Sequence, residues 1–340
     1  MEVMHVVMIF IAALASSAQP SSAETLGEAR GAALQADARH ALELLRGVDA
    51  TSLSVKDRNF VTCMRTRFGS AVPATTSRPA SFADRVLAIY YSYWYAALTR
   101  PDVRNQEERR LDASLRKLLK ARTGADLDVL LKKRLGAAGL HSLEGRTGLL
   151  RELMVWRKQE EVDTPVALPE AQFRVKVYYL DGFKSFGWSY YATCGRSSTG
   201  GWTTDGGLYV VVPRYDSLRD EQFRVSFLAH EAQHFADKAR FKDLKPWELE
   251  FRAKLVEVAL AEKTRTDVLD SFVDDQGDDP ADAHSYADRK LLADLTKRLR
   301  LGDVRELYAV EPKALQSAAR EALLDDSRRR SGAVDTAAKK

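Results

Sequence analysis

Two of the six histidines in the chain lie four residues apart, in the stretch LAHEAQHFAD at residues 228–237. On an α-helix, with about 3.6 residues per turn, the side chains of His230 and His234 project from the same face. Two neutral imidazoles in this arrangement can bind Zn²⁺ and leave a position open for water. Glu231 lies beside His230, where its carboxylate can take a proton from that water. The spacing therefore predicts a hydrolytic zinc site.

The other interpretation of these histidines is a pair of core residues that hydrogen-bond locally. The segment FRVSFLAHEAQHFADKAR, residues 223–240, favours the zinc site, because it has no Pro or Gly and its apolar residues recur at helical spacing. Phe223 and Phe227 precede the histidines in one helical row, so we expect the imidazoles to continue a buried stripe. A chance His-Glu-x-x-His pattern is expected in roughly one such chain in a hundred.

A second predicted helix, PWELEFRAKLVEVALAEK at residues 246–263, offers two candidates for a third ligand. Glu248 and Glu250 lie at its start, and at about 100° per residue they point roughly 160° apart. Only one of them can face the metal. Hydrophobic periodicity leaves a polar edge on both sides of this helix and does not choose between them. The other interpretation of Glu250 is a surface ion pair with Lys254, four residues along.

Together, a short β-type segment, a His-Glu-x-x-His helix and a following helix with a glutamate resemble the zincin metallopeptidases whose third ligand is Glu, the gluzincins. The segment Glu250-Phe251-Arg252-Ala253 resembles the Glu-x-x-Ala-Asp segment of CAAX-prenyl-protease-like metallopeptidases, with Lys254 where that family has Asp. The resemblance covers about residues 205–262. It implies that Glu250 rather than Glu248 is the third zinc ligand, with the small Ala253 allowing close approach of the two helices.

The resemblance also implies an activity, zinc-dependent hydrolysis of peptide bonds in a peptide or protein substrate. His284 and Tyr286, in DAHSYADRK, are then candidates for a second donor to the developing oxyanion. A polar surface position is the other interpretation of both residues. We expect the strand predicted at GGLYVVVP, residues 206–213, to hold an extended substrate by strand addition. Two other functions fit the same residues: a catalytically silent binding or scaffold protein, and a zinc hydrolase acting on cell-wall peptides.

The elements that would position these residues predict an α+β fold. Amphipathic segments punctuated by Gly, Pro and Thr predict a mostly helical N-terminal region over residues 24–161. The segment VDTPVALPE, residues 162–170, is the predicted boundary because of its two prolines. A zincin-like domain with a small sheet is expected over residues 162–326. Its predicted strands are FRVKVYYL, GWSYYATC and GLYVVVP, at residues 173–180, 187–194 and 207–213.

Aromatic residues cluster in one predicted helix of the N-terminal region, SFADRVLAIYYSYWYAALTR at residues 81–100. They could line a binding groove, but a bulky stripe in a helix is more often core. The residues concerned are Tyr90, Tyr91, Tyr93, Trp94 and Tyr95.

Residues 3–15, VMHVVMIFIAALA, form an apolar run with the length of a signal-peptide core, and small residues follow it. We therefore expect residues 1–23 to be a cleaved signal peptide and the protein to be secreted or periplasmic. An uncleaved membrane anchor is the alternative, although the run is short for a bilayer core of about 30 Å. No second apolar run approaches about 18 residues, so no integral membrane segment is expected after cleavage.

Charge and cysteine usage add three expectations. The net charge of +4 is small and basic residues are spread through the predicted helices, so no nucleic-acid partner is expected. The segment SRRRSGAVDTAAKK, residues 327–340, predicts a disordered, solvated basic tail. Cys63 and Cys194 are the two cysteines of the chain, and they can form one disulfide in an oxidising compartment or remain two buried thiols.

Overall fold

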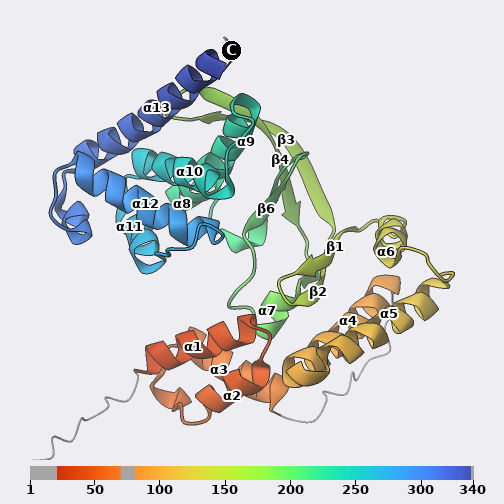
Figure 1. Cartoon of the computed structure of the whole chain (residues 1–340). Helices are drawn as coiled ribbons and strands as arrows, with labels where there is room; N and C mark the ends of the chain where they lie inside the picture. The colour runs from red at the N-terminus through yellow and green to blue at the C-terminus, as the bar shows by residue number, and fades with distance from the viewer. Residues whose placement is uncertain (1–20, 70–80, 338–340) are drawn as a thin grey trace, which may run out of the picture. The chain divides into compact units, whose positions relative to one another are not determined.

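The computed structural model describes residues 21–69 and 81–337 (Figure 1). The fold is α+β, as predicted, and it contains two small sheets where one was expected. The chain divides into two compact units. Unit 1 contains the residues up to Val155 together with Ser185–Ser198, and unit 2 contains Trp156–Lys184 and the residues from Thr199 onward. The expected signal peptide lies almost entirely within residues 1–20, outside the described residues.

Unit 1 is mostly helical. Its helices are α1 (Ser22–Leu34), α2 (Ala38–Leu45), α3 (Val55–Phe68), α4 (Phe82–Thr99), α5 (Arg104–Leu119), α6 (Leu127–Gly136) and α7 (Trp188–Ala192). Its strands are β1 (His141–Thr147), β2 (Leu150–Trp156), whose last residue belongs to unit 2, and β5 (Ser185–Phe186), in the order β1-β2-β5. Serine caps begin several helices: Ser21 and Ser81 form capping boxes with Glu24 and Asp84, which satisfy backbone N–H groups at the first turn.

The aromatic cluster of α4 divides between two environments. Tyr90, Tyr93 and Trp94 are buried in the core of unit 1, as the core interpretation predicted. The indole N–H of Trp94 donates to the carbonyl oxygen of Arg151, 2.8 Å away, which ties α4 to β2. Tyr91 and Tyr95 are only half-buried, and both line a pocket. The core interpretation is therefore correct for three of the five residues, and the other two line a pocket.

The helical region is shorter than predicted, and the predicted boundary is a strand. Helix α6 ends at Gly136, and the chain then forms β1 and β2. A short buried apolar run such as LRELMVW in β2 cannot be distinguished from a buried helix by periodicity alone. The segment at 162–170 lies largely in β3 (Lys158–Ala167), where Pro165 is tolerated because β3 is an edge strand.

The segment 187–194 is also not the strand that we predicted, because it folds as helix α7. The carboxylate of Glu152 accepts the backbone N–H of Trp188 at 3.0 Å, near the start of this helix. Gly187 has φ of 91°, and a Cβ there would lie 2.3 Å from a carboxylate oxygen of Glu152, so a glycine is needed at this position. Tertiary contacts override the β-type composition of this run.

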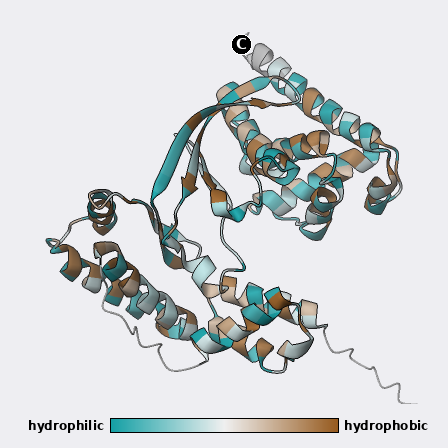
Figure 2. Cartoon of the chain, turned by 180° about the vertical axis from the view of Figure 1, so that it is seen from behind, coloured by the Kyte–Doolittle hydropathy of each residue, from teal (hydrophilic) through white to brown (hydrophobic). Residues whose placement is uncertain are grey.

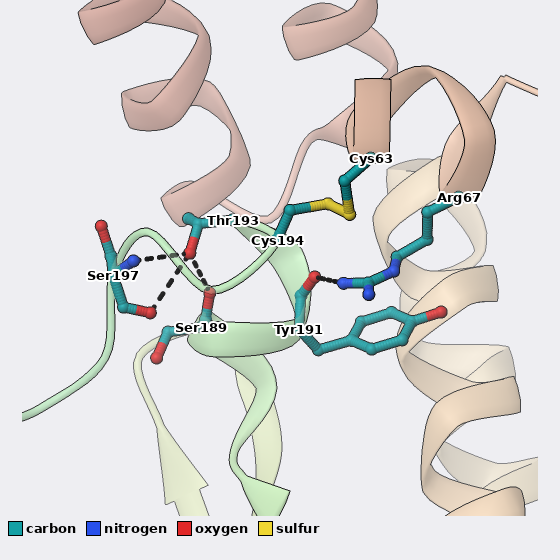
Figure 3. Close-up of a disulfide and its surroundings, with 7 residues drawn as sticks. All are labelled: Cys63, Arg67, Ser189, Tyr191, Thr193, Cys194 and Ser197. Carbon is teal, nitrogen blue, oxygen red and sulfur yellow. Dashed lines mark hydrogen bonds between the residues drawn. A yellow bond between two sulfur atoms is a disulfide. The ribbon is translucent and has the colours of Figure 1, made fainter. Parts of the chain in front are cut away.

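A disulfide joins Cys63 on α3 to Cys194, two residues beyond α7 (Figure 3). The first of the two expectations for these cysteines is therefore correct. Both cysteines belong to unit 1, and their sequence separation is 131 residues. The bond holds the segment Ser185–Ser198, which is distant in sequence, against the helices of that unit.

Unit 2 is built on a four-stranded sheet in the order β3-β4-β7-β6. The remaining strands are β4 (Gln172–Asp181), β6 (Gly201–Thr204) and β7 (Gly207–Val211). Its helices are α8 (Glu221–Phe223), a π-helical segment η4 (Arg224–Ala229), α9 (His230–Arg240), α10 (Pro246–Leu260), α11 (Arg265–Asp274), α12 (Ala283–Arg298) and α13 (Pro312–Ala337). Short 3₁₀ turns occur in unit 1 at Ala50–Ser52 and Pro101–Val103, and in unit 2 at Val212–Arg214 and Val304–Ala309.

One face of the sheet in unit 2 packs on helices. Apolar residues of β4 and β7, among them Val177 and Val210, join residues of α10 and α12 in one core. Helix α10 contacts α9, α12 and α13, while α9 contacts β4. Strand β3 is largely hydrophilic along its length (Figure 2), in agreement with its mainly exposed residues. Helix α10 is therefore central in unit 2, and its neighbours cover most of its circumference.

The C-terminal segment was predicted to be a disordered tail from residue 327, and this prediction is wrong as far as residue 337. Helix α13 continues to Ala337. Arg330 bonds Asp326 at 2.7 Å and Glu248 on α10 at 3.0 Å, so this basic residue pairs with acids of the folded unit. Residues 338–340 lie outside the described part of the chain. No helix in the described residues is long and apolar enough to span a bilayer.

Candidate metal centre

The helix that carries His230 and His234 does not begin as a regular α-helix. The π-helical segment Arg224–Ala229 precedes α9 directly. A π turn contains more residues than an α turn, so the residues from Phe223 to His230 do not follow strict α-helical spacing. Phe223 and Phe227 nevertheless stack, with ring centroids 5.9 Å apart. Isolated π turns inside helices are found frequently at functional sites.

His230, His234 and Glu250 converge, and their potential ligand atoms all lie within 4.8 Å of one another. The Nε2 atoms of the two histidines are 3.2 Å apart. One carboxylate oxygen of Glu250 is 3.3 Å from His234 Nε2, and the other is 3.4 Å from His230 Nε2. In a tetrahedral zinc site with bonds of about 2.0–2.1 Å, neighbouring ligand atoms lie about 3.3–3.4 Å apart. The three side chains are therefore close enough together that they could hold a zinc ion.

Glu248, the other candidate for the third ligand, faces away from the histidines. Its carboxylate accepts the backbone N–H of Lys245 at 2.8 Å and pairs with Arg330 of α13 at 3.0 Å. The two glutamates thus lie on the two polar edges of α10, and each edge is covered by a different neighbour. Ala253 is fully buried, and α9 and α10 are in contact.

Glu257 contacts the site and was not predicted from the sequence. Its Oε1 atom lies 2.6 Å from Nδ1 of His230, and both side chains are buried. This contact assigns a proton to Nδ1 and leaves the Nε2 lone pair for a metal. The sequence contained one signal that could have identified Glu257: it lies seven residues after Glu250, two helical turns along the same face of α10.

Lys254, which stands where the CAAX-prenyl-protease-like segment has Asp, does not pair with Glu250. Its ammonium group bonds both carboxylate oxygens of Asp288 on α12, at 2.6 and 2.7 Å. Both residues are buried. The surface pair between Glu250 and Lys254, the other interpretation of Glu250, is therefore not formed. Instead Lys254 joins α10 to α12, the helix that carries His284.

The helix of Glu250 is further held by a buried guanidinium group. Arg252 is fully buried and bonds Asp326 of α13 at 2.7 Å, Asp237 of α9 at 2.8 Å and Glu170 at 3.0 Å. A buried charge of this kind requires several partners. The cluster joins α9, α10 and α13 two residues away from Glu250 and so ties the helix of Glu250 to the helix of the histidines.

The charges of the site are strongly coupled. Burial alone lowers the pKa of His230, but hydrogen bonds to Glu250 and Glu257 outweigh it and raise this pKa to about 10. For Glu250, burial raises the pKa, but hydrogen bonds from His230, His234 and His284 outweigh it and hold the pKa well below its usual range. Glu250 is thus an anion facing imidazoles, and metal binding there would displace a proton from His230.

The three potential ligands open onto a pocket of about 430 Å³. Glu231 lines this pocket beside His230 and His234, so a carboxylate that is not a ligand faces the same space. Glu231 also acts on a neighbouring tyrosine, since burial and the carboxylate of Glu231 raise the pKa of Tyr215 to about 12. Lys238 of α9 lines the pocket too.

The edge strand at this pocket is β6, not the predicted strand at 206–213. Strand β7 pairs with β4 on one side and with β6 on the other, so it is internal to the sheet. Trp202 and Thr203 of β6 line the metal pocket. A Cβ at Gly201 would lie 2.3 Å from the carbonyl oxygen of Tyr209 and 2.5 Å from the ring of Phe227, so only glycine permits this approach of β6 to its neighbours.

His284 and Tyr286, the two candidates for a second donor, have different surroundings. His284 lines the pocket, and its Nδ1 atom is 3.1 Å from a carboxylate oxygen of Glu250. The side chain of His284 is 64% exposed, so it can also reach a bound substrate. Tyr286 does not line the pocket, and its ring packs edge-on against Trp247 with centroids 5.2 Å apart. The structure brings only His284 to the site.

Comparisons with known proteins add no relative: no family model, curated protein or solved structure matches the chain. The functional interpretation therefore rests on the site itself. Two imidazole nitrogens and one carboxylate oxygen form the donor set of many catalytic zinc sites, in which the fourth position is left to water or substrate. His230, His234 and Glu250 supply that set in type and in number, and their potential ligand atoms lie within 4.8 Å of one another.

Proposed function

We propose that the chain is a zinc-dependent peptidase with His230, His234 and Glu250 as metal ligands. The observation that carries the proposal is the separation of 3.2–3.4 Å between the facing atoms of these side chains at the wall of a pocket that Glu231 also lines. A purely structural zinc site takes four protein ligands and has no use for a free carboxylate. The open pocket and Glu231 favour catalysis over a structural role.

Each residue then has a defined part in amide hydrolysis. Zn²⁺, when bound, would polarise the scissile carbonyl group and lower the pKa of a water molecule. Glu231 takes a proton from the attacking water and transfers it to the leaving amine. His284 donates a hydrogen bond to the carbonyl oxygen as negative charge develops on it. Glu257 holds His230 in the tautomer that presents Nε2.

The proposed substrate is an extended peptide that adds to the sheet at β6. Strand β6 pairs with β7 along one edge, and its residues Trp202 and Thr203 border the pocket of Glu231. Backbone groups of an edge strand can pair with an incoming chain whatever its side chains are. The main-chain hydrogen bonds would bring a scissile bond past the metal ligands, while side-chain pockets would select the residues on either side of it.

The test of this function is metal analysis of the purified protein together with a proteolysis assay on unfolded casein, with and without a chelator. We expect about one zinc per chain and cleavage that stops on chelation and returns on addition of Zn²⁺. Zinc at full occupancy without cleavage of casein or of cell-wall peptides would favour the scaffold function. Absence of bound zinc after incubation with excess Zn²⁺ would refute the metal site altogether.

We also infer that the protein works outside the cytoplasm. The apolar run at residues 3–15 motivates this inference, and the Cys63–Cys194 disulfide supports it because such bonds persist in oxidising compartments. Mass spectrometry of the protein from cell fractions tests it. We expect the exported form to lack the apolar run, and a cytosolic protein that retains residues 3–15 would contradict the inference.

A further inference from the structure

We infer that unit 1 contains a second binding site, for a small aromatic or apolar molecule with one anionic group. The site is a pocket of about 750 Å³, here called the aromatic pocket, which is lined by residues of α3 and α4 and by Tyr191 of α7. All its lining residues belong to unit 1, and none is part of the candidate metal centre. The inference is therefore independent of the proposed peptidase activity.

Two helix faces form the sides of the aromatic pocket. Helix α3 contributes a polar face, with Asn59, Thr62 and Thr66 at helical spacing. Helix α4 contributes Ala88 and the tyrosines at 91 and 95. Small polar residues on α3 cannot fill the space opposite the α4 tyrosines, so a cavity remains between the two helices. Its volume lies within the range of about 300–1,000 Å³ that is usual for small-molecule sites.

Aromatic rings provide the apolar wall of the pocket. Tyr91 and Tyr191 are stacked with centroids 5.3 Å apart, and Tyr95 stacks on Phe68 at 6.2 Å. Both Tyr91 and Tyr191 are partly exposed to the pocket. Planar or aliphatic ligand groups gain from contact with such rings, both through burial of apolar surface and through ring stacking.

One positive charge marks a preferred position for an anion. Among the residues that the structure describes, the lining of the aromatic pocket contains a single charged side chain, Arg67, and no carboxylate. The guanidinium carbon of Arg67 lies 4.5 Å from the centre of the Tyr191 ring, and one N–H group donates to the carbonyl oxygen of Tyr191 (Figure 3). A guanidinium group has five N–H donors, so others remain for a carboxylate or sulfonate.

Covalent and polar links hold the wall that carries Tyr191. The Cys63–Cys194 disulfide attaches this wall to α3, and Cys63 itself lines the pocket. The hydroxyl of Thr193 donates to the carbonyl oxygen of Ser189 at 2.7 Å and accepts the backbone N–H of Ser197 at 2.9 Å (Figure 3). These links set the position of Tyr191 before any ligand binds, which lowers the entropic cost of binding.

The test uses the full-length protein and the fluorescent probe 1-anilinonaphthalene-8-sulfonate, which combines planar rings with one negative charge. Arg67→Gln removes the charge of the pocket, and Arg67→Lys keeps it. Ala88→Trp and Ser92→Trp fill the pocket from α4. Arg58→Gln is the matched control, because Arg58 lies on α3 and is exposed outside the pocket. N-phenyl-1-naphthylamine, a neutral relative of the probe, tests whether the anion matters.

We expect saturable binding of about one probe per chain, weakened about tenfold to a hundredfold by Arg67→Gln, less by Arg67→Lys, and not by Arg58→Gln. Each tryptophan variant should abolish binding of both probes. Arg67→Gln should not weaken binding of the neutral probe. Probe binding that survives both tryptophan substitutions, in variants whose disulfide and far-ultraviolet circular dichroism are native, would overturn the site. Equal effects of Arg67→Gln and Arg58→Gln would overturn the preference for an anion.

Discussion

Glu257 Oε1 and His230 Nδ1 lie 2.6 Å apart in the interior of unit 2, and this contact joins the C-terminal part of α10 to the first residue of α9. The imidazole is thereby held with Nε2 directed toward Glu250, from which it is 3.4 Å away. A buried imidazole without such a partner could rotate or change tautomer. The geometry of the candidate metal centre thus depends on a residue that is not one of the three potential ligands.

Replacement of Glu257 by Gln should weaken zinc binding by about 10- to 100-fold, because a partner of this kind orients the ligand and increases its basicity. Glu257→Ala should have at least the same effect. Zinc affinity can be measured by competition with a chromophoric chelator. The control is Glu262→Gln, because Glu262 is exposed just beyond the end of α10. Unchanged affinity in both Glu257 variants would show that His230 does not need this contact.

Glu250→Ala should reduce zinc affinity by roughly 100-fold or more, since it removes one of three protein ligands. Glu248→Ala should leave the affinity nearly unchanged, because Glu248 pairs with Arg330 and the N–H of Lys245. The same competition assay compares the two variants. The opposite ranking would assign the third ligand to Glu248 and contradict the arrangement of α10 described above.

Glu231→Gln should lower peptide hydrolysis by about 10²- to 10⁴-fold through loss of the general base. The zinc content should remain that of the native protein, because Glu231 lines the pocket and is not one of the converging ligands. Initial rates on a fluorogenic peptide, together with metal analysis, check both parts. A variant that loses its zinc would instead identify Glu231 as a ligand.

His284→Ala should lower kcat by about 10²- to 10³-fold at saturating zinc, with a smaller change in KM, if His284 stabilises the developing oxyanion. Tyr286→Phe should have no effect, because the Tyr286 ring packs against Trp247 and does not line the pocket. Steady-state kinetics of the two variants separate these outcomes. Loss of turnover in Tyr286→Phe alone would transfer the role to Tyr286.

Removal of the disulfide in a Cys63→Ser/Cys194→Ser variant should lower the free energy of unfolding of unit 1 by about 2–5 kcal/mol. The bond closes a long loop, with a sequence separation of 131 residues, and so restricts the unfolded chain strongly. Urea denaturation followed by circular dichroism gives the difference. Addition of a reductant should destabilise the native protein but leave the double variant unaffected.

Predictions from the sequence are correct where the residues of a single helix or strand determine its conformation. The α+β class followed from the change of residue pattern along the chain, and β4 and β7 lie where short runs of β-type residues were predicted to be strands. Predictions fail where neighbours decide the conformation. Residues 187–194 have strand composition but fold as α7, at whose start Glu152 accepts a backbone N–H. The segment from residue 327 has the composition of a solvated tail, but Arg330 within it pairs with Glu248.

The sequence by itself determined the convergence of His230 and His234 and the adjacent position of Glu231, because their arrangement depends only on the geometry of a single helix. The tertiary structure decided which polar edge of α10 faces these histidines. Helical periodicity states which residues share a face, but it does not state what covers that face. Here α9 covers the edge of Glu250, while α13 covers that of Glu248 through Arg330.

The same reason explains the residues that only the tertiary structure could bring to the site. Glu257 and His284 contact His230 and Glu250 because α9, α10 and α12 pack together around buried ion pairs such as Lys254 with Asp288. Likewise, alternation along a strand predicts its two faces but not its position in the strand order of the sheet. The tertiary structure shows that β6, and not β7, is the edge strand that borders the pocket. Long-range packing, which no local period encodes, decided these positions.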